Sequence, residues 1–144
     1  MYFEDFTDGL VVTTQGRTVT EADIVLFAGL SGDFHPIHTN EVFARQTPLG
    51  RRVAHGALIL SMSIGLTTRL NALDDTLLAL AALDKVRFSA PVVAGDTISV
   101  NKQVAGTLAM DATRGAVTFH TRVINQEGRV VISYTDKILL KRKT

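Results

Sequence analysis

The sequence has no cysteine and no long apolar run. The missing cysteine excludes disulfide scaffolds, thiolate zinc sites and cysteine nucleophiles. The longest mainly apolar stretch, Ala57 to Leu66, is far shorter than the ~20 residues that a membrane-spanning helix needs. Acidic side chains lie within the first few residues, which a secretory signal peptide avoids. We therefore expect a soluble, cytoplasmic protein that does not insert into membranes.

An excess of either charge is also lacking. The 15 basic and 14 acidic side chains leave a formal net charge of +1, so no strong field attracts nucleic acid or an anionic membrane surface. The apolar fraction is 46% and the charged fraction 20%, as in ordinary globular proteins. The length of 144 residues fits one domain, which we predict to span residues 1–144.

The first half of the chain carries helix signals. Thr20–Asp23 is a variant of the capping box and predicts the start of a helix, which Gly32 is suited to end. A short helix is predicted from Glu41 to about Arg45, capped by Asn40 or Thr39. These two helices flank a polar segment that contains a proline.

A third helix is predicted from Gly56 to about Leu70, and the second half of the chain alternates with period two. The helix is apolar nearly all round, which indicates burial of most of its surface. Pro91–Asp96 and Asn125–Gly128 are both predicted to be hairpin turns. At least five strands are expected, in the regions Leu10–Val19, Leu77–Leu83, Lys85–Ala90, Thr97–Asn101, Val117–Val123 and Arg129–Leu140. The pattern predicts an α+β fold in which an antiparallel sheet wraps around one long apolar helix.

The stretch GDFHPIHTN gathers Asp33, His35 and His38 directly after a predicted helix end. Pro36 prevents that helix from continuing and biases His35 toward extended backbone. A rigid, irregular segment of this kind can direct side chains into a cleft, but Asp after Gly is also a common turn residue, and the segment could simply cap the next helix. Its residues alone leave both interpretations open.

Metal and serine chemistry fit the sequence less well. Asp33, His35, His38 and His55 are potential ligands, but no histidine pair has the helical spacing of a metalloprotease, so no metal site is predicted. The nucleophile motif G-x-S-x-G of serine hydrolases is absent.

His55-Gly56 is the second polar signal. A glycine that begins a buried helix leaves free backbone N–H groups at its positive end, where an oxyanion can bind, although glycine is also tolerated at an ordinary helix start. An acid–base pair near such a helix end suits chemistry beside a carbonyl, where an enolate must be stabilised.

GDFHPIHTNEVFA, followed by VAHG and an apolar helix, resembles the MaoC-like dehydratases, which include the (R)-specific enoyl-CoA hydratases. The later KVRFSAPVVAGDTI is similar to the strand–turn–strand after the central helix of that family, and the resemblance covers roughly Arg17 to Leu139. It implies a single hotdog domain, in which a curved antiparallel sheet wraps the central helix. It also implies a homodimer with thioester sites at the subunit interface.

The resemblance implies reversible syn hydration of trans-2-enoyl-CoA to (R)-3-hydroxyacyl-CoA. Asp33 and His38 match the catalytic pair, with Asp33 as the base for water and His38 as its partner, and the N–H of Gly56 matches the oxyanion donor. His35 and Asn40 depart from the Asn and Asp that are frequent in the family, and neither change touches the pair. We expect His35 to turn outward.

Substrate contacts are expected around this pair. Arg51 and Arg52 could meet the phosphates of coenzyme A or remain solvated loop charges. His55 is expected to hold the loop geometry. Residues lining the acyl tunnel are predicted to be Phe34, Leu58 and Leu66. No cofactor is expected beyond the coenzyme A or acyl-carrier-protein thioester, which is the substrate.

Two alternatives stay open. A non-catalytic hotdog subunit could bind acyl thioesters or support a heteromer, but the intact Asp33–His38 pair argues against it. A hotdog thioesterase usually carries an acid on or near the central helix, and Ala57–Leu70 contains none.

Overall fold

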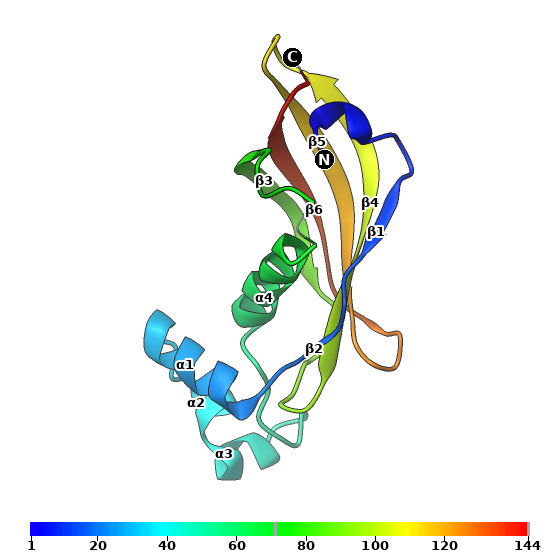
Figure 1. The fold of residues 1–144 in the computed structure, drawn as a ribbon. Helices are drawn as coiled ribbons and strands as arrows, with labels where there is room; N and C mark the ends of the chain where they lie inside the picture. Colours follow the sequence, from blue (N-terminus) through cyan, green and yellow to red (C-terminus); the bar gives the residue numbers. More distant parts are fainter. Residues whose placement is uncertain (71, 144) are drawn as a thin grey trace.

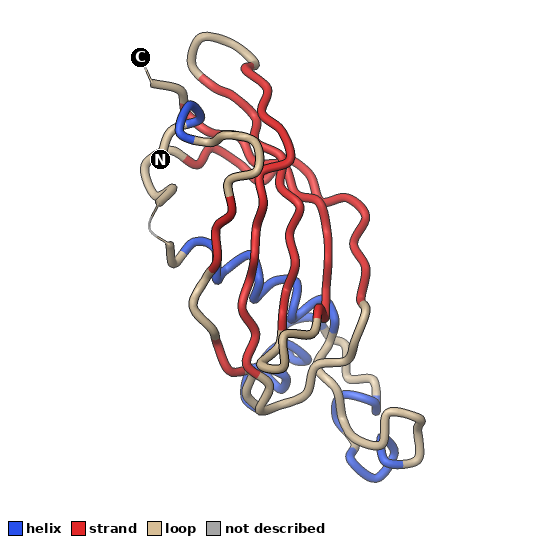
Figure 2. The backbone as a smooth tube through the Cα atoms, turned by 90° about the vertical axis from the view of Figure 1, so that its right-hand side faces the viewer, coloured by secondary structure: helices blue, strands red, loops and turns tan. Residues whose placement is uncertain are grey.

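An antiparallel sheet curves around one central helix in the computed structural model, which describes residues 1–70 and 72–143 (Figure 1). Helices α1 to α3 gather at one end of the sheet, and both chain termini lie at the other end. The tube in Figure 2 shows that α4 runs across one face of the sheet. The elements are η1 (Phe3–Asp5), β1 (Val11–Thr13), β2 (Arg17–Thr18), α1 (Glu21–Ser31), α2 (Pro36–Thr39), α3 (Glu41–Arg45), α4 (Gly56–Thr68), β3 (Leu77–Phe88), β4 (Thr97–Ala109), β5 (Arg114–Ile124) and β6 (Val130–Lys141).

The sheet has the strand order β1-β4-β5-β6-β3, and β2 also pairs with β4. Asn125–Gly128 forms the predicted hairpin turn between β5 and β6, with the N–H of Asn125 donating to the carbonyl of Arg129. The prediction of a hairpin at Pro91–Asp96 is wrong, because β3 pairs with β6 and not with β4. Both edges of β4 are occupied by other strands, so β3 occupies the remaining edge of β6 and Pro91–Asp96 crosses the sheet.

Strand limits also differ from the prediction in two places. The regions predicted as Leu77–Leu83 and Lys85–Ala90 belong mostly to one strand, β3, whose register against β6 shifts between Asp84 and Arg87. Lys85 has a φ of 53° at this irregularity. The single strand expected over Leu10–Val19 is two short strands, β1 and β2. Both differences arise from bulges and breaks that a period-two pattern does not reveal.

The predicted helix caps are confirmed. Thr20 and Asp23 form the capping box of α1, and Gly32 ends that helix with a φ of 77°. Asn40 caps α3 by accepting from the N–H of Phe43. The segment at Pro36 is not irregular as predicted, because Pro36 occupies the first position of the short helix α2, where its fixed φ is favourable and its missing N–H costs nothing.

Helix α4 is buried or half-buried over most of its surface, as expected, and one narrow stripe is exposed. Its buried residues include Ile59, Met62 and Ser63, which pack against the inward-facing side chains of the sheet. The small residues Ala57, Ser61 and Gly65 recur every four positions and form an exposed stripe. None of the helices in the described part of the chain is long and apolar enough to cross a membrane.

Candidate active site

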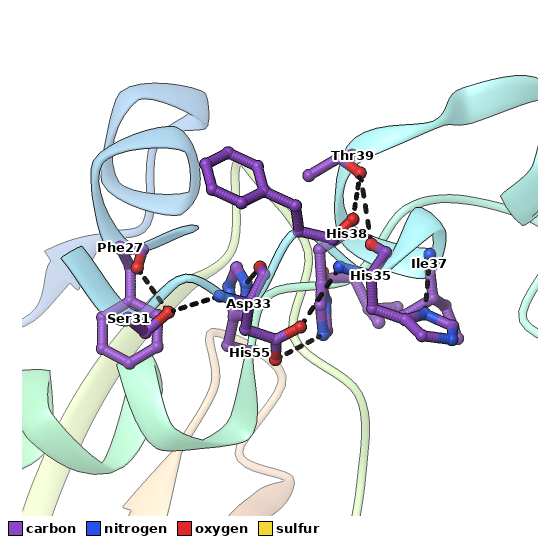
Figure 3. Close-up of polar contacts among 10 residues, drawn as sticks. Phe27, Ser31, Asp33, His35, Ile37, His38, Thr39 and His55 are labelled. Carbon is purple, nitrogen blue, oxygen red and sulfur yellow. Dashed lines mark hydrogen bonds and ion pairs between the residues drawn. The ribbon is translucent and has the colours of Figure 1, made fainter. Parts of the chain in front are cut away.

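Asp33 is held just beyond the left-handed residue that ends α1. Its backbone N–H donates to Ser31 Oγ over 3.2 Å, and its Oδ1 accepts from the N–H of His35 over 3.2 Å. Its side chain is 50% exposed, and Oδ2 points toward His38 (Figure 3). The loop therefore fixes one carboxylate oxygen and leaves the other free for chemistry.

His38 lies on α2 with a defined tautomer. Its Nδ1 is 2.7 Å from the carbonyl oxygen of Val53. Because a carbonyl only accepts, Nδ1 carries the proton and Nε2 is the basic nitrogen of the neutral ring. Nε2 lies 3.8 Å from Asp33 Oδ2, and the side chain of His38 is only 13% exposed. The two groups face each other at a distance too long for a direct hydrogen bond.

His55 contacts both Asp33 and His38. Its Nε2 donates to the backbone carbonyl of Asp33 over 2.9 Å, and its ring stacks on His38 with centroids 3.8 Å apart. The residue is 2% exposed, and Nδ1 has no hydrogen-bond partner among the described residues. His55 thus holds the loop that carries Asp33 and limits the movement of the His38 ring.

Gly56 begins α4 beside the same site. The first N–H groups of a helix have no intrahelical acceptor, so the Gly56 N–H is available to a ligand. A Cβ at this position would lie 2.7 Å from one ring atom of Phe88 and 2.8 Å from another, so a larger residue requires the ring of Phe88, which is 58% exposed, to move. A cleft of about 670 Å³ brings His38, Gly56 and Phe88 together.

Phe34 is exposed, whereas Leu58 is buried. Phe34 is 61% exposed on the segment beside Asp33, where a ligand could reach it. Leu58 and Leu66 lie on the buried face of α4 and do not line this cleft. His35 points away from the pair and caps α2 by accepting from the N–H of Ile37, which accounts for its outward orientation.

Arg51 and Arg52 differ in their exposure and in their ion pairs. Arg51 is exposed, whereas Arg52 forms ion pairs with Glu21 on α1 and Glu41 on α3. The hydrogen bond from Arg52 lowers the pKa of the Glu41 carboxyl. Since these contacts tie the guanidinium of Arg52 to two helices, Arg51 is the better candidate for a phosphate ligand.

Asp33, His38 and His55 could also offer a metal one ligand atom each within 4.8 Å. A metal requires lone pairs that converge on one point. The stacked imidazoles lie only 27° from parallel, so their in-plane lone pairs do not converge well. The arrangement fits proton transfer better than metal binding.

Comparisons with known proteins identify the family of the chain. Residues 4–128 match the family model described as MaoC like domain. The chain is 38% identical over 132 residues to an (R)-specific enoyl-CoA hydratase of Rhodospirillum rubrum, covering 91% of this chain and 85% of that protein. It superimposes on a MaoC-like dehydratase structure from Rhodospirillum rubrum with a TM-score of 0.89 and 26% identity, covering 100% and 99% of the two chains.

A more distant structure supports the fold alone. A Mycobacterium tuberculosis protein with a double hotdog fold superimposes with a TM-score of 0.82 at 19% identity, covering 99% of this chain and 44% of that one. The sheet wrapped around α4 is therefore a hotdog fold, as predicted.

Proposed function

Because the chain belongs to the MaoC-like dehydratase family and is a hydro-lyase, we propose that it catalyses the reversible hydration of trans-2-enoyl thioesters to (R)-3-hydroxyacyl thioesters. The observation that carries the proposal is the 3.8 Å approach of His38 Nε2 to Asp33 Oδ2. A water molecule at hydrogen-bond distance from both atoms fits this gap.

Hydration starts with Asp33 ionised and His38 protonated on both ring nitrogens, and Asp33 Oδ2 takes a proton from that water as its oxygen bonds to C3 of the substrate. The electron pair of the C2–C3 double bond moves toward the thioester carbonyl, and His38 delivers a proton from Nε2 to C2. The proton on Asp33 then returns to His38, which restores both groups. Dehydration runs through the same steps in reverse, with neutral His38 removing the C2 proton and protonated Asp33 releasing water.

The developing enolate oxygen requires a donor, and the Gly56 N–H supplies it in this mechanism. The positive end of the α4 dipole adds to the stabilisation of negative charge there. Loss of one such donor typically raises the barrier by about 2.7–4 kcal/mol. The absence of a side chain at Gly56 supports this role, because a Cβ there would lie within 3 Å of the Phe88 ring and crowd the approach to the N–H.

We further propose a homodimer in which the sheet edge formed by β3 meets the partner. Strand β3 pairs only with β6 among the described strands, so its outer edge has unpaired backbone groups. Leu77, Leu78 and Leu80 on this strand are all more than 40% exposed. An apolar, unpaired edge is a natural template for pairing with another chain. Size-exclusion chromatography with light scattering should give twice the mass of the chain, and Leu78→Lys should shift it toward the monomer.

The carrier of the acyl group is coenzyme A or an acyl carrier protein, and the mechanism uses no cofactor. Incubation with crotonyl-CoA tests the proposal by following loss of the enoyl absorbance together with release of free thiol. Hydration without thiol release is the expected result. Thiol release would identify a thioesterase instead, and no reaction with several enoyl-CoAs would identify a non-catalytic subunit.

A further inference from the structure

A second cavity lies at the opposite end of α4 from Gly56. It has a volume of about 350 Å³ and is bounded by α4, β3 and the inner face of the sheet. Most of its lining is apolar and includes Ile64, Leu80 and Leu83. Three charged side chains also line it, namely Asp74, Lys102 on β4 and Asp136 on β6, and the last two are only 11% and 3% exposed. A charged pair inside an apolar cavity requires an explanation.

The contacts of this pair leave part of the ammonium group unused. Lys102 Nζ lies 2.5 Å from Asp136 Oδ2, and the other carboxylate oxygen accepts from Thr121 Oγ1 over 2.5 Å. Lys102 Nζ also lies 4.3 Å from the centroid of the Phe119 ring. An ammonium group has three N–H donors. Among the described residues only Asp136 accepts a hydrogen bond from Lys102, so two donors remain without an acceptor.

Stability alone does not account for the pair. Replacing a buried ion pair with apolar side chains of similar volume is often neutral or stabilising. Thr121 satisfies the second oxygen of the carboxylate, whereas the ammonium has donors to spare. Ligand binding would use these donors.

The cavity and the cleft beside His38 both lie along α4 and β6, although they share no lining residue. Ile132 lines the cleft beside His38, and Tyr134, two residues further on the same face of β6, lines the second cavity. From Gly56 to Ile64 the helix rises about 12 Å. An extended chain advances roughly 1.2 Å per bond, so about ten bonds would cover that distance.

We propose that this cavity binds the distal end of the acyl group of the substrate, and that Lys102 donates a hydrogen bond to a neutral oxygen at that end, such as a hydroxyl group. The proposal rests on the hydratase function proposed above, because it takes the thioester to lie at Gly56. It names the substrate class as acyl thioesters of about ten carbons with an oxygen near the end of the chain.

The charge balance favours a neutral oxygen over a carboxylate. A terminal carboxylate would lose its hydration shell and approach the carboxylate of Asp136, which is already buried. A terminal methyl group would leave the donors of Lys102 unpaired. A hydrogen bond to a charged group is worth enough that the hydroxyl should bind roughly tenfold to a hundredfold more tightly than the methyl.

Isothermal titration with two saturated thioesters, decanoyl-CoA and 10-hydroxydecanoyl-CoA, tests the inference. Neither can be hydrated, so their binding is independent of catalysis. We expect the hydroxylated thioester to bind at least tenfold more tightly than decanoyl-CoA, and decanedioyl-CoA to bind more weakly than the hydroxylated compound. The double variant Lys102→Met/Asp136→Leu should bind the first two compounds with equal affinity. The matched control Lys137→Met, which changes an exposed lysine on β6, should retain the preference.

Equal affinities in the unmodified protein, tighter binding of decanedioyl-CoA, or no binding of any of the three would overturn the inference. The preference is measured on the unmodified protein, so it does not depend on the folding of the double variant. Failure of the protein to hydrate crotonyl-CoA, together with a clear preference for the hydroxylated thioester, would overturn the catalytic proposal and leave the assignment of the cavity standing.

Discussion

Replacing Asp33 and His38 singly and together tests whether they act on one water molecule. Asp33 Oδ2 and His38 Nε2 are 3.8 Å apart. A water oxygen about 2.8 Å from each atom would bond to both at an angle of about 85°, which one water can accommodate. The two side chains would then serve a single event, and removal of either would disable it.

This geometry sets the size of the expected effects. Loss of a general acid or base lowers the rate by roughly 10²- to 10⁴-fold, which we expect for Asp33→Asn and for His38→Asn. Independent contributions would multiply in the double variant to roughly 10⁴- to 10⁸-fold. Residues that act as a unit are strongly non-additive. We therefore expect kcat/KM of the double variant to be within about tenfold of kcat/KM of the less active single variant.

The assay is the hydration of crotonyl-CoA, followed by loss of the enoyl absorbance under kcat/KM conditions. Asparagine at position 38 keeps an N–H that can donate to the carbonyl of Val53, so α2 should stay in place. His35→Asn serves as the control, because it keeps a cap for α2 and should change the rate less than twofold. A double variant whose loss equals the product of the single losses would refute the shared water.

Three further predictions concern other parts of the molecule. Gly56→Ala should lower kcat/KM for crotonyl-CoA by roughly tenfold to a hundredfold. A second change, Phe88→Ala, should restore part of the loss, because it removes the 2.7 Å contact with the new Cβ. If Phe88→Ala restores nothing, the steric explanation is wrong. Burial raises the pKa of Tyr134 to about 12, so the stability linked to its neutral form is complete below about pH 10 and is lost as the pH rises toward 12. Urea unfolding should show that Tyr134→Phe lacks this loss, which is on the order of 3 kcal/mol for two pKa units. An unchanged pH dependence in the variant would count against this account. Arg51→Gln should raise KM several-fold with little effect on stability. Arg52→Gln should leave KM unchanged and lower the free energy of unfolding by about 0.5–1 kcal/mol, because it removes two ion pairs. The opposite result would assign phosphate binding to Arg52 and the structural role to Arg51.

Local signals in the sequence predicted the helix limits well. The capping box of α1 and the cap of α3 each depend on residues within three positions of one another, so a short window contains the whole interaction. Pro36 was harder to interpret, because a proline that cannot continue one helix can occupy the first position of the next. The partner of β3 lies more than 40 residues away along the chain, and alternation alone does not say which strands become neighbours.

The polar site was predictable only where its signals are local in the sequence. Asp33, His38 and Gly56 were identified from their spacing and from the family resemblance. The hydrogen bond from His55 to the Asp33 carbonyl and the contact of Phe88 with Gly56 were not, since both join distant segments. Lys102 did leave a signal, because it is in phase with the inward-facing residues Ile98 and Val100 on β4.

The pairing of β3 with β6 also has a consequence for synthesis of the chain on the ribosome. Strand β3 ends at Phe88 and β6 ends at Lys141, so 53 residues (141 − 88) are added after β3 is complete before its partner strand is finished. At 5–20 residues per second this takes roughly 3–10 seconds. During that time the apolar sequence LLALAAL has no strand to pair with, and the nascent chain presents it to its surroundings. The order of the strands thus makes the interval between completion of β3 and completion of β6 the period when this segment is most exposed to aggregation and to capture by chaperones.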